Sequence, residues 1–271
     1  MRKVRLGKTG ITVNKNGFGA LPVQRRSLYE AVKIIRKAYE NGIDFFDTAR
    51  AYSDSETKLG AALSDVRDKV IIATKTMAKT GDKMREDLEK SLEELKTDHV
   101  DIYQFHNPEF CPRPGDESGL YDEALKAKEE GKILHIGITN HRHTVAVEAI
   151  ESGLYETMQF PFSYLADEHD LKIVEMCAEK DMGFLCMKGL AGGLIKRSDI
   201  AYAYQTQFDH TLPIWGVQWE KELDEFLSYQ ENEPVFDSQM ADFIAKEKEE
   251  LAGEFCRGCG YCAMSCGDIH T

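Results

Sequence analysis

Short apolar runs alternate with amphipathic stretches along most of this chain of 271 residues. In Leu28–Glu40 and Lys83–Leu95 the apolar residues recur three and four positions apart, which is the spacing of one face of an α-helix. The runs that we predict to form strands are Asn16–Leu21, Ile43–Thr48, Val70–Lys75, Val100–His106, Ile133–Thr139, Thr157–Pro161, Gly183–Lys188 and Thr211–Trp215. Strands that alternate with helices indicate parallel β/α units, and eight such units close most simply into a (β/α)8 TIM barrel of the α/β class.

Both ends of the chain depart from this alternation. The segment Val4–Val13, which has a glycine-containing turn in its middle, predicts a β-hairpin ahead of the first barrel strand. Near Tyr229 the composition becomes polar and turn-rich, and Ser238–Leu251 then predicts a charged, solvated helix. We therefore expect a barrel over residues 1–229 and a C-terminal extension over residues 230–271.

The amino-acid composition and net charge exclude several classes of protein. Apolar residues make up 42% and charged residues 30% of the chain, which is typical of a soluble globular protein. The net charge of −13 argues against a general nucleic-acid binder, because such proteins present a basic surface. No apolar run reaches the roughly 18 residues of a membrane span, and the N-terminus lacks the apolar segment of a signal peptide. We expect a cytoplasmic protein with neither a nucleic-acid partner nor a membrane.

Four ionisable residues stand at or just beyond the ends of consecutive predicted strands: Asp47, Tyr52, Lys75 and His106. The active site of a TIM barrel lies at this rim, so the four side chains can converge. Reduction of a carbonyl needs a hydride at carbon and a proton at oxygen. A tyrosine, with an ordinary pKa near 10, becomes a better acid beside a lysine ammonium, because the positive charge favours the phenolate. Each residue taken alone is more often structural, but the set favours catalysis.

This set resembles the catalytic tetrad of the aldo-keto reductase family, with Asp47 in a Phe-Asp-Thr-Ala run that precedes Tyr52. The resemblance extends over nearly the whole barrel. It implies Tyr52 as the general acid, Lys75 and Asp47 as residues that tune it, and His106 as the residue that orients the carbonyl. It also implies a small-molecule carbonyl or alcohol as substrate and NADPH or NADH as cofactor.

The same resemblance implies a nicotinamide site at the ends of the later strands. Thr139, Asn140 and Gln159 match residues that bind the carboxamide. Met187 stands where the family often has a tyrosine that stacks on the nicotinamide, and a thioether covers an aromatic face less rigidly. Lys188 would contact the pyrophosphate. A plain glycine-rich turn is the alternative interpretation of this last segment.

The adenosine end of the predicted site is the weaker match. Gly216 and Gln218 lie in a stretch that resembles the loop for the adenosine phosphate, but Glu222 and Phe226 replace the residues expected downstream. A glutamate at this place would repel a 2′-phosphate, which favours NADH over NADPH. A GxGxxG motif is absent, so a Rossmann domain finds no support.

Four of the seven cysteines form a compact run near the C-terminus: Cys256, Cys259, Cys262 and Cys266. Their spacing, C-x2-C-x2-C-x3-C, is typical of the [4Fe–4S] run of bacterial ferredoxins, whereas zinc sites more often split their ligands into two pairs. Zinc and unligated thiols remain alternatives, and so does another fourth ligand. A subgroup of aldo-keto reductases carries a similar cysteine-rich tail that usually runs on further, so a truncated tail is one interpretation of this segment.

Two functions therefore compete. The first is an NAD(P)H-dependent carbonyl reductase or alcohol dehydrogenase with an accessory iron–sulfur cluster. The second is an electron-transfer protein whose cluster exchanges electrons with a redox partner and whose barrel is a scaffold. Tyr52 and Lys75 together favour the first function, because a scaffold has no need of that pair.

Overall fold

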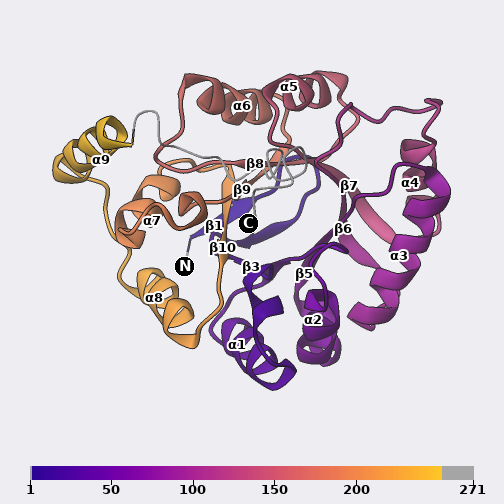
Figure 1. Cartoon of the computed structure of the whole chain (residues 1–271), viewed down its shortest axis with the longest axis horizontal. Coiled ribbons are helices and arrows are strands. Elements are labelled where there is room, and N and C mark those ends of the chain that lie inside the picture. Colours follow the sequence, from indigo (N-terminus) through magenta and orange to yellow (C-terminus); the bar gives the residue numbers. More distant parts are fainter. Residues whose placement is uncertain (1, 252–271) are drawn as a thin grey trace, which may run out of the picture.

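A closed barrel of eight parallel strands forms the centre of the structure, a computed structural model that describes residues 2–251 (Figure 1). The predicted cysteine site, Cys256, Cys259, Cys262 and Cys266, lies outside the described residues. In chain order the barrel strands are β3 (Gly17–Gly19), β4 (Phe45–Asp47), β5 (Ile71–Thr76), β6 (Val100–His106), β7 (Ile133–Thr139), β8 (Thr157–Pro161), β9 (Gly183–Met187) and β10 (Thr211–Gly216). Pairing of β10 with β3 closes the barrel, so the predicted TIM barrel is confirmed.

Helices surround the barrel, as Figure 1 shows. They are α1 (Leu28–Glu40), α2 (Ser55–Leu63), α3 (Gly81–Leu95), α4 (Leu120–Glu129), α5 (His143–Ser152), α6 (Glu168–Glu179), α7 (Ser198–Thr206), α8 (Glu220–Glu231) and α9 (Ser238–Glu250), with short 3-10 turns η1 (Pro22–Arg25), η2 (Ser64–Lys69) and η3 (Ala191–Gly193). Helix α1 has the predicted bounds, because Ser27 and Glu30 form a capping box at its start. Helix α3 begins earlier than predicted, since the Thr80 side chain caps it.

The predicted N-terminal hairpin is present and closes one end of the barrel. Its strands β1 (Lys3–Arg5) and β2 (Thr12–Asn14) pair antiparallel. Val4 and Val13 pack inside the barrel against apolar residues of β4, β5, β6, β9 and β10. The turn requires glycine at Gly7, because its φ is +51° and a Cβ would lie 2.3 Å from the Asp181 carbonyl oxygen. The functional rim is therefore at the opposite end, where the parallel strands finish.

The C-terminal segment of the described chain packs on the outside of this barrel. Helix α9 lies at the periphery beside α7 in Figure 1, and its Ile244 is buried in a cluster with Tyr164 and Trp215. Helix α8 continues through the predicted boundary at residue 229 and ends at Glu231. The division into 1–229 and 230–271 stays a prediction.

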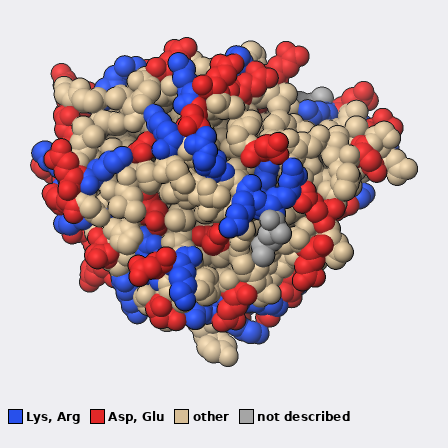
Figure 2. Space-filling model, turned by 180° about the vertical axis from the view of Figure 1, so that it is seen from behind, with Lys and Arg blue, Asp and Glu red and all other residues tan. Residues whose placement is uncertain are grey.

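The surface matches the composition of the chain. On the face shown in Figure 2, acidic and basic side chains are interspersed. Within residues 2–251, no helix combines the length and the apolar character that crossing a membrane requires.

Candidate active site

A buried ion pair lies inside the barrel at the ends of β4 and β5. The Lys75 ammonium donates to Asp47 Oδ2 at 2.7 Å and to the Thr48 carbonyl oxygen at 2.6 Å, and both charged side chains are almost fully buried. Burial opposes the charge of Lys75, but Asp47 and Tyr52 raise its pKa overall. Burial raises the pKa of Asp47, and the ion pair with Lys75 opposes that rise. Lys75 is therefore held as a cation in a fixed place.

Tyr52 lies on the loop between β4 and α2, directly over this pair. Its ring centroid is 5.0 Å from the Lys75 Nζ atom, and its ring is perpendicular to that of His106 with the centroids 5.7 Å apart. The structure thus brings together the four residues that the sequence predicted at this rim. Burial raises the pKa of Tyr52, and the charge of Lys75 acts in the predicted direction by lowering it. The net pKa is nevertheless above the ordinary value, because burial outweighs the lysine.

His106 ends β6 and completes the group. Burial, then the charge of Lys75, then His141 lower the pKa of His106 to about 3. The imidazole is therefore neutral at physiological pH and can donate one hydrogen bond. Its Nδ1 atom is buried and has no hydrogen-bond partner among the residues that the structure describes.

A hydrogen-bonded chain of amides continues from Asp47 across the barrel. The Gln159 Nε2 atom donates to Asp47 Oδ2 at 3.4 Å, and the Gln104 Nε2 atom donates to Gln159 Oε1 at 3.0 Å. Gln159 is thus buried beside the tetrad. Gln104 was not predicted from the sequence, although its place two residues before His106 puts both side chains on the same face of the strand.

Thr139 and Asn140, predicted at the nicotinamide, are occupied with contacts inside the protein. The Thr139 side-chain oxygen accepts from the Asn107 amide at 3.1 Å. The Asn140 amide donates to the Pro108 carbonyl oxygen at 2.8 Å, and its oxygen accepts from the backbone of Arg142 at 2.9 Å. These bonds join the loops that follow β6 and β7.

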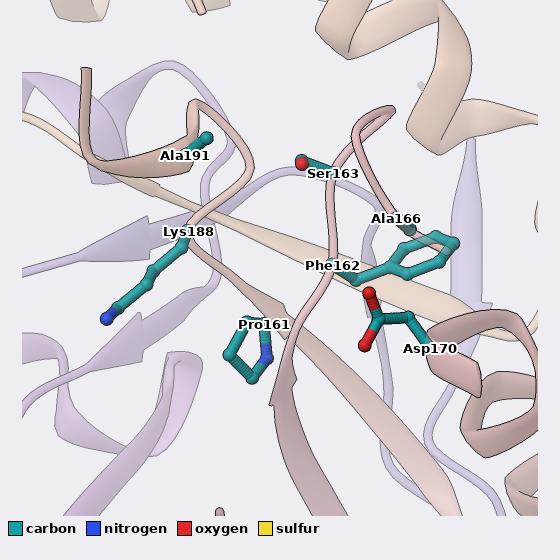
Figure 3. A pocket seen from close by; sticks show the side chains of 7 residues that line it. All are labelled: Pro161, Phe162, Ser163, Ala166, Asp170, Lys188 and Ala191. Atoms are coloured by element: carbon teal, nitrogen blue, oxygen red, sulfur yellow. The ribbon is translucent and has the colours of Figure 1, made fainter. Parts of the chain in front are cut away.

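Met187 is the last residue of β9, and Lys188, which follows it, lines a small cavity between the ends of β8 and β9. Figure 3 shows Lys188 and Asp170 on opposite sides of this cavity, with Pro161 and Phe162 between them. Lys188 has a left-handed backbone, with φ of +59°. The predicted contacts of Met187 and Lys188 with a dinucleotide stay predictions.

Gly216 ends β10 at the surface, and Gln218 lies just before Trp219, the N-cap residue of α8. The backbone amides of Gln218 and Trp219 both donate to Glu222 Oε2, at 2.8 Å and 3.0 Å. Glu222 therefore folds back on its own helix and satisfies two of the amides that a helix start leaves without partners.

A larger cavity of about 460 Å³ opens beside His106, between the loops that follow β5 and β6. This volume falls in the range of small-molecule sites. Its apolar wall includes Met77, Phe105, Phe110 and Leu120. The arrangement can hold the apolar group of a small molecule whose polar end contacts His106.

One other cluster has side chains of metal-binding type. The ligand atoms of His143, Asp167 and Asp170 lie within 4.8 Å of one another. His143 bonds to Asp170 at 2.8 Å, and Asp167 and Asp170 form the capping box at the start of α6. Because these bonds account for the cluster, we assign no metal to it.

Comparison with known proteins finds some that resemble this chain in sequence and some that resemble it in fold. It is 32% identical over 211 residues to L-galactose dehydrogenase of Arabidopsis thaliana, an alignment that covers 70% of this chain and 66%, just under two thirds, of that protein. It is 26% identical to the NADH-specific methylglyoxal reductase of Escherichia coli over 72% of this chain and 69% of that protein. The holo form of an aldo-keto reductase from Bacillus halodurans shares the fold, with a TM-score of 0.80 and 20% identity over 91% of this chain and 96% of that one. The sequence model described as the Aldo/keto reductase family matches residues 16–235, so this chain belongs to that family.

Proposed function

We propose that this protein reduces an aldehyde or ketone to an alcohol, or catalyses the reverse reaction, with a nicotinamide dinucleotide. The observation that carries the proposal is the buried Lys75–Asp47 ion pair beneath Tyr52, with a neutral His106 on the other side. A bound dinucleotide would supply the hydride to the carbonyl carbon. The Tyr52 hydroxyl donates the proton to the carbonyl oxygen, and the Lys75 ammonium stabilises the phenolate that remains. The imidazole of His106 donates a hydrogen bond to the same oxygen and fixes its direction.

The rim offers places for both reactants. The apolar cavity beside His106 takes the substrate, with the carbonyl toward Tyr52. On the other side, Gly192 and Gly193 have positive φ, and a Cβ at either position would meet nothing within 4 Å. Backbone amides in such an open glycine turn suit a pyrophosphate, and Lys188 precedes the turn. We infer that Met187, Lys188 and this turn hold the dinucleotide.

The test is Tyr52→Phe. We expect turnover of methylglyoxal or 4-nitrobenzaldehyde to fall by about 10²–10⁴-fold, the usual worth of a general acid. Binding of the dinucleotide, followed by the fluorescence of Trp215 and Trp219, should not change, because the phenol acts on the substrate. Tyr39→Phe, at a half-buried tyrosine of α1 outside the candidate active site, is the matched control and should retain turnover. Full turnover by Tyr52→Phe would overturn the assignment.

For the cofactor we propose NADH over NADPH. The support is Glu222, which places a carboxylate at the start of α8 and occupies the two amides there. Two cations of α1 near this helix start are already paired, since Lys33 and Lys37 both bond to Glu220. A 2′-phosphate would lose those donors and meet a negative charge, which costs about 1 kcal/mol at the surface. One relative, the Escherichia coli methylglyoxal reductase, is named as NADH-specific.

The experiment compares dissociation constants of both dinucleotides for the parent and for Glu222→Gln. We expect NADH to bind more tightly to the parent, and the variant to gain about fivefold in NADPH affinity, which corresponds to about 1 kcal/mol. Glu231→Gln, at the far end of α8, is the control. Tighter binding of NADPH by the parent would contradict the proposal.

We also propose an accessory [4Fe–4S] cluster on Cys256, Cys259, Cys262 and Cys266, as in the subgroup that the sequence resembles. The spacing of the cysteines supports it. Protein purified without oxygen, from cells able to assemble clusters, should be brown and contain about four iron and four sulfide per chain. Cys256→Ser should lose iron, whereas Cys111→Ser, in the loop between β6 and α4, should retain it. Stoichiometric zinc without sulfide would refute the cluster.

A further inference from the structure

A second group of interacting buried side chains, the chain Arg50–Glu56–Thr74, lies behind the loop that carries Tyr52. Arg50, two residues before Tyr52, points outward between α2 and α3 and is ion-paired with Glu56 and Glu94. The Glu56 side chain is only 1% exposed. Its Oε1 atom accepts a hydrogen bond of 2.5 Å from the Thr74 hydroxyl.

This chain joins the two elements on which the proposed chemistry depends. Thr74 directly precedes Lys75 on β5, and neighbouring residues of a strand point to opposite faces. Thr74 therefore faces the helices while Lys75 faces the barrel interior. The Arg50 backbone amide also donates to the Lys75 carbonyl oxygen at 2.9 Å. The Tyr52 loop is thus attached to the Lys75 strand by a backbone bond and by the side chains of Arg50, Glu56 and Thr74.

Stability alone is a weak reason for such a chain. A buried ion pair costs about as much in desolvation as it returns, and apolar residues of similar size often serve a fold equally well. Burial raises the pKa of Glu56, which the hydrogen bond from Thr74 and the charge of Arg50 oppose. The residue after the tyrosine, Ser53, has φ of +43°, so the loop is held in a conformation that an L-residue adopts at a cost. The advantage of the chain Arg50–Glu56–Thr74 is that it fixes the position of the Tyr52 loop relative to the strand that carries Lys75.

We propose that Arg50, Glu56 and Thr74 are positioning residues, which hold the Tyr52 hydroxyl in a fixed position relative to the Lys75 ammonium. This inference rests on the proposed function. It concerns how the acid is tuned, while Tyr52→Phe tests whether Tyr52 is the acid at all.

The decisive variants are Glu56→Gln and Thr74→Val, with Thr74→Ser as the conservative variant. Tyrosine labelled with carbon-13 at Cζ reports the titration of Tyr52 by NMR, with the signal assigned by its loss in Tyr52→Phe. We expect the titration of Tyr52 to move to higher pH in Glu56→Gln and Thr74→Val, since the phenol loses its fixed approach to Lys75. Thr74→Ser, which keeps the hydroxyl, should restore the parent titration.

Turnover gives the second measurement. A misplaced acid should lower kcat by between about tenfold and about 100-fold, while the dissociation constant of NADH stays unchanged. Asp101→Asn is the matched control, because Asp101 forms another buried pair, 2.7 Å from Arg67, at the closed end of the barrel. It should lower stability without moving the Tyr52 titration.

The outcomes separate the two proposals. If Glu56→Gln melts lower, as Asp101→Asn does, but keeps the parent titration of Tyr52 and the parent kcat, the chain is only structural and the inference is wrong. If Tyr52→Phe retains turnover, the proposed function fails instead, and the NMR titration still shows whether Glu56 sets the pKa of Tyr52.

Discussion

The neutral His106 predicts a measurable loss of stability in mild acid. An unfolded chain would protonate this histidine near its ordinary pKa of about 6.5, whereas the folded protein does so at about 3. Because the folded-state pKa is lower, protons bind preferentially to the unfolded chain. The contribution to stability is complete above the unfolded pKa and is lost progressively as the pH falls toward the folded one.

The size of this loss follows from the two pKa values. Linkage gives about 1.4 kcal/mol for each pH unit below the unfolded pKa, so lowering the pH from 7 to 5 removes about 2 kcal/mol of unfolding free energy. In a chain of this length that corresponds to roughly 4–8 °C in melting temperature. The side chain is largely buried, so solvent screens the effect only weakly.

The assay is urea unfolding at pH 7, 6 and 5, for the parent and for His106→Asn. Asparagine keeps a polar side chain but cannot titrate, so the variant should lose about 2 kcal/mol less than the parent over this range. The difference between the two slopes isolates His106 from the remaining carboxylates and histidines. Equal slopes would show that His106 is not held neutral, and its assignment as a hydrogen-bond donor to the carbonyl would lose its electrostatic basis.

Three further substitutions test the packing that supports the site, each by its melting temperature and urea midpoint. Ser53→Gly should stabilise by about 0.5–1 kcal/mol, because glycine adopts the left-handed backbone at +43° without strain; a destabilised variant would contradict this. Gly60→Ala should cost about 1–3 kcal/mol, since a Cβ would lie 2.2 Å from the Glu94 carbonyl oxygen, and a neutral result would refute that contact. Asp101→Asn should cost about 3 kcal/mol by leaving Arg67 buried without its counter-charge, and unchanged stability would show that water reaches the pair.

The strands were predictable to the extent that their sequence is apolar on both faces. β6, β7 and β8 have the predicted bounds, because barrel strands are covered by helices outside and by side chains inside. β4 is shorter than predicted, since the Ile43 amide donates to the Ala38 carbonyl oxygen and belongs to the turn after α1. An apolar residue in a buried turn has the same pattern as one in a buried strand, so sequence could not separate them.

The residues of the candidate active site were likewise predictable only in part. Convergence of Asp47, Lys75 and His106 followed from a rule about strand ends and needed no coordinates. Glu56 and Gln104 were not predicted, because an isolated polar residue in a helix or strand carries no sign of burial or of partners. Only the assembled barrel shows that Glu56 bonds to the residue next to Lys75 and that Gln104 bonds to Gln159.

Glu222 has a structural role in addition to the one that the sequence suggested. From the sequence we inferred only that a carboxylate at this position repels a 2′-phosphate. The structure shows that the same carboxylate also caps the start of α8. Trp219, at the N-cap position, is a residue type with little capping ability, so the Glu222 carboxylate, which accepts from the backbone amides of Gln218 and Trp219, is the side chain that secures this helix start. Removing its charge to admit NADPH therefore also weakens the helix start. Trp219→Ser combined with Glu222→Gln should recover part of the stability that Glu222→Gln alone loses, because the serine hydroxyl can accept a bond from an amide in the first turn of α8. The gain in NADPH affinity should persist in the double variant, since it depends on the missing charge and not on the cap.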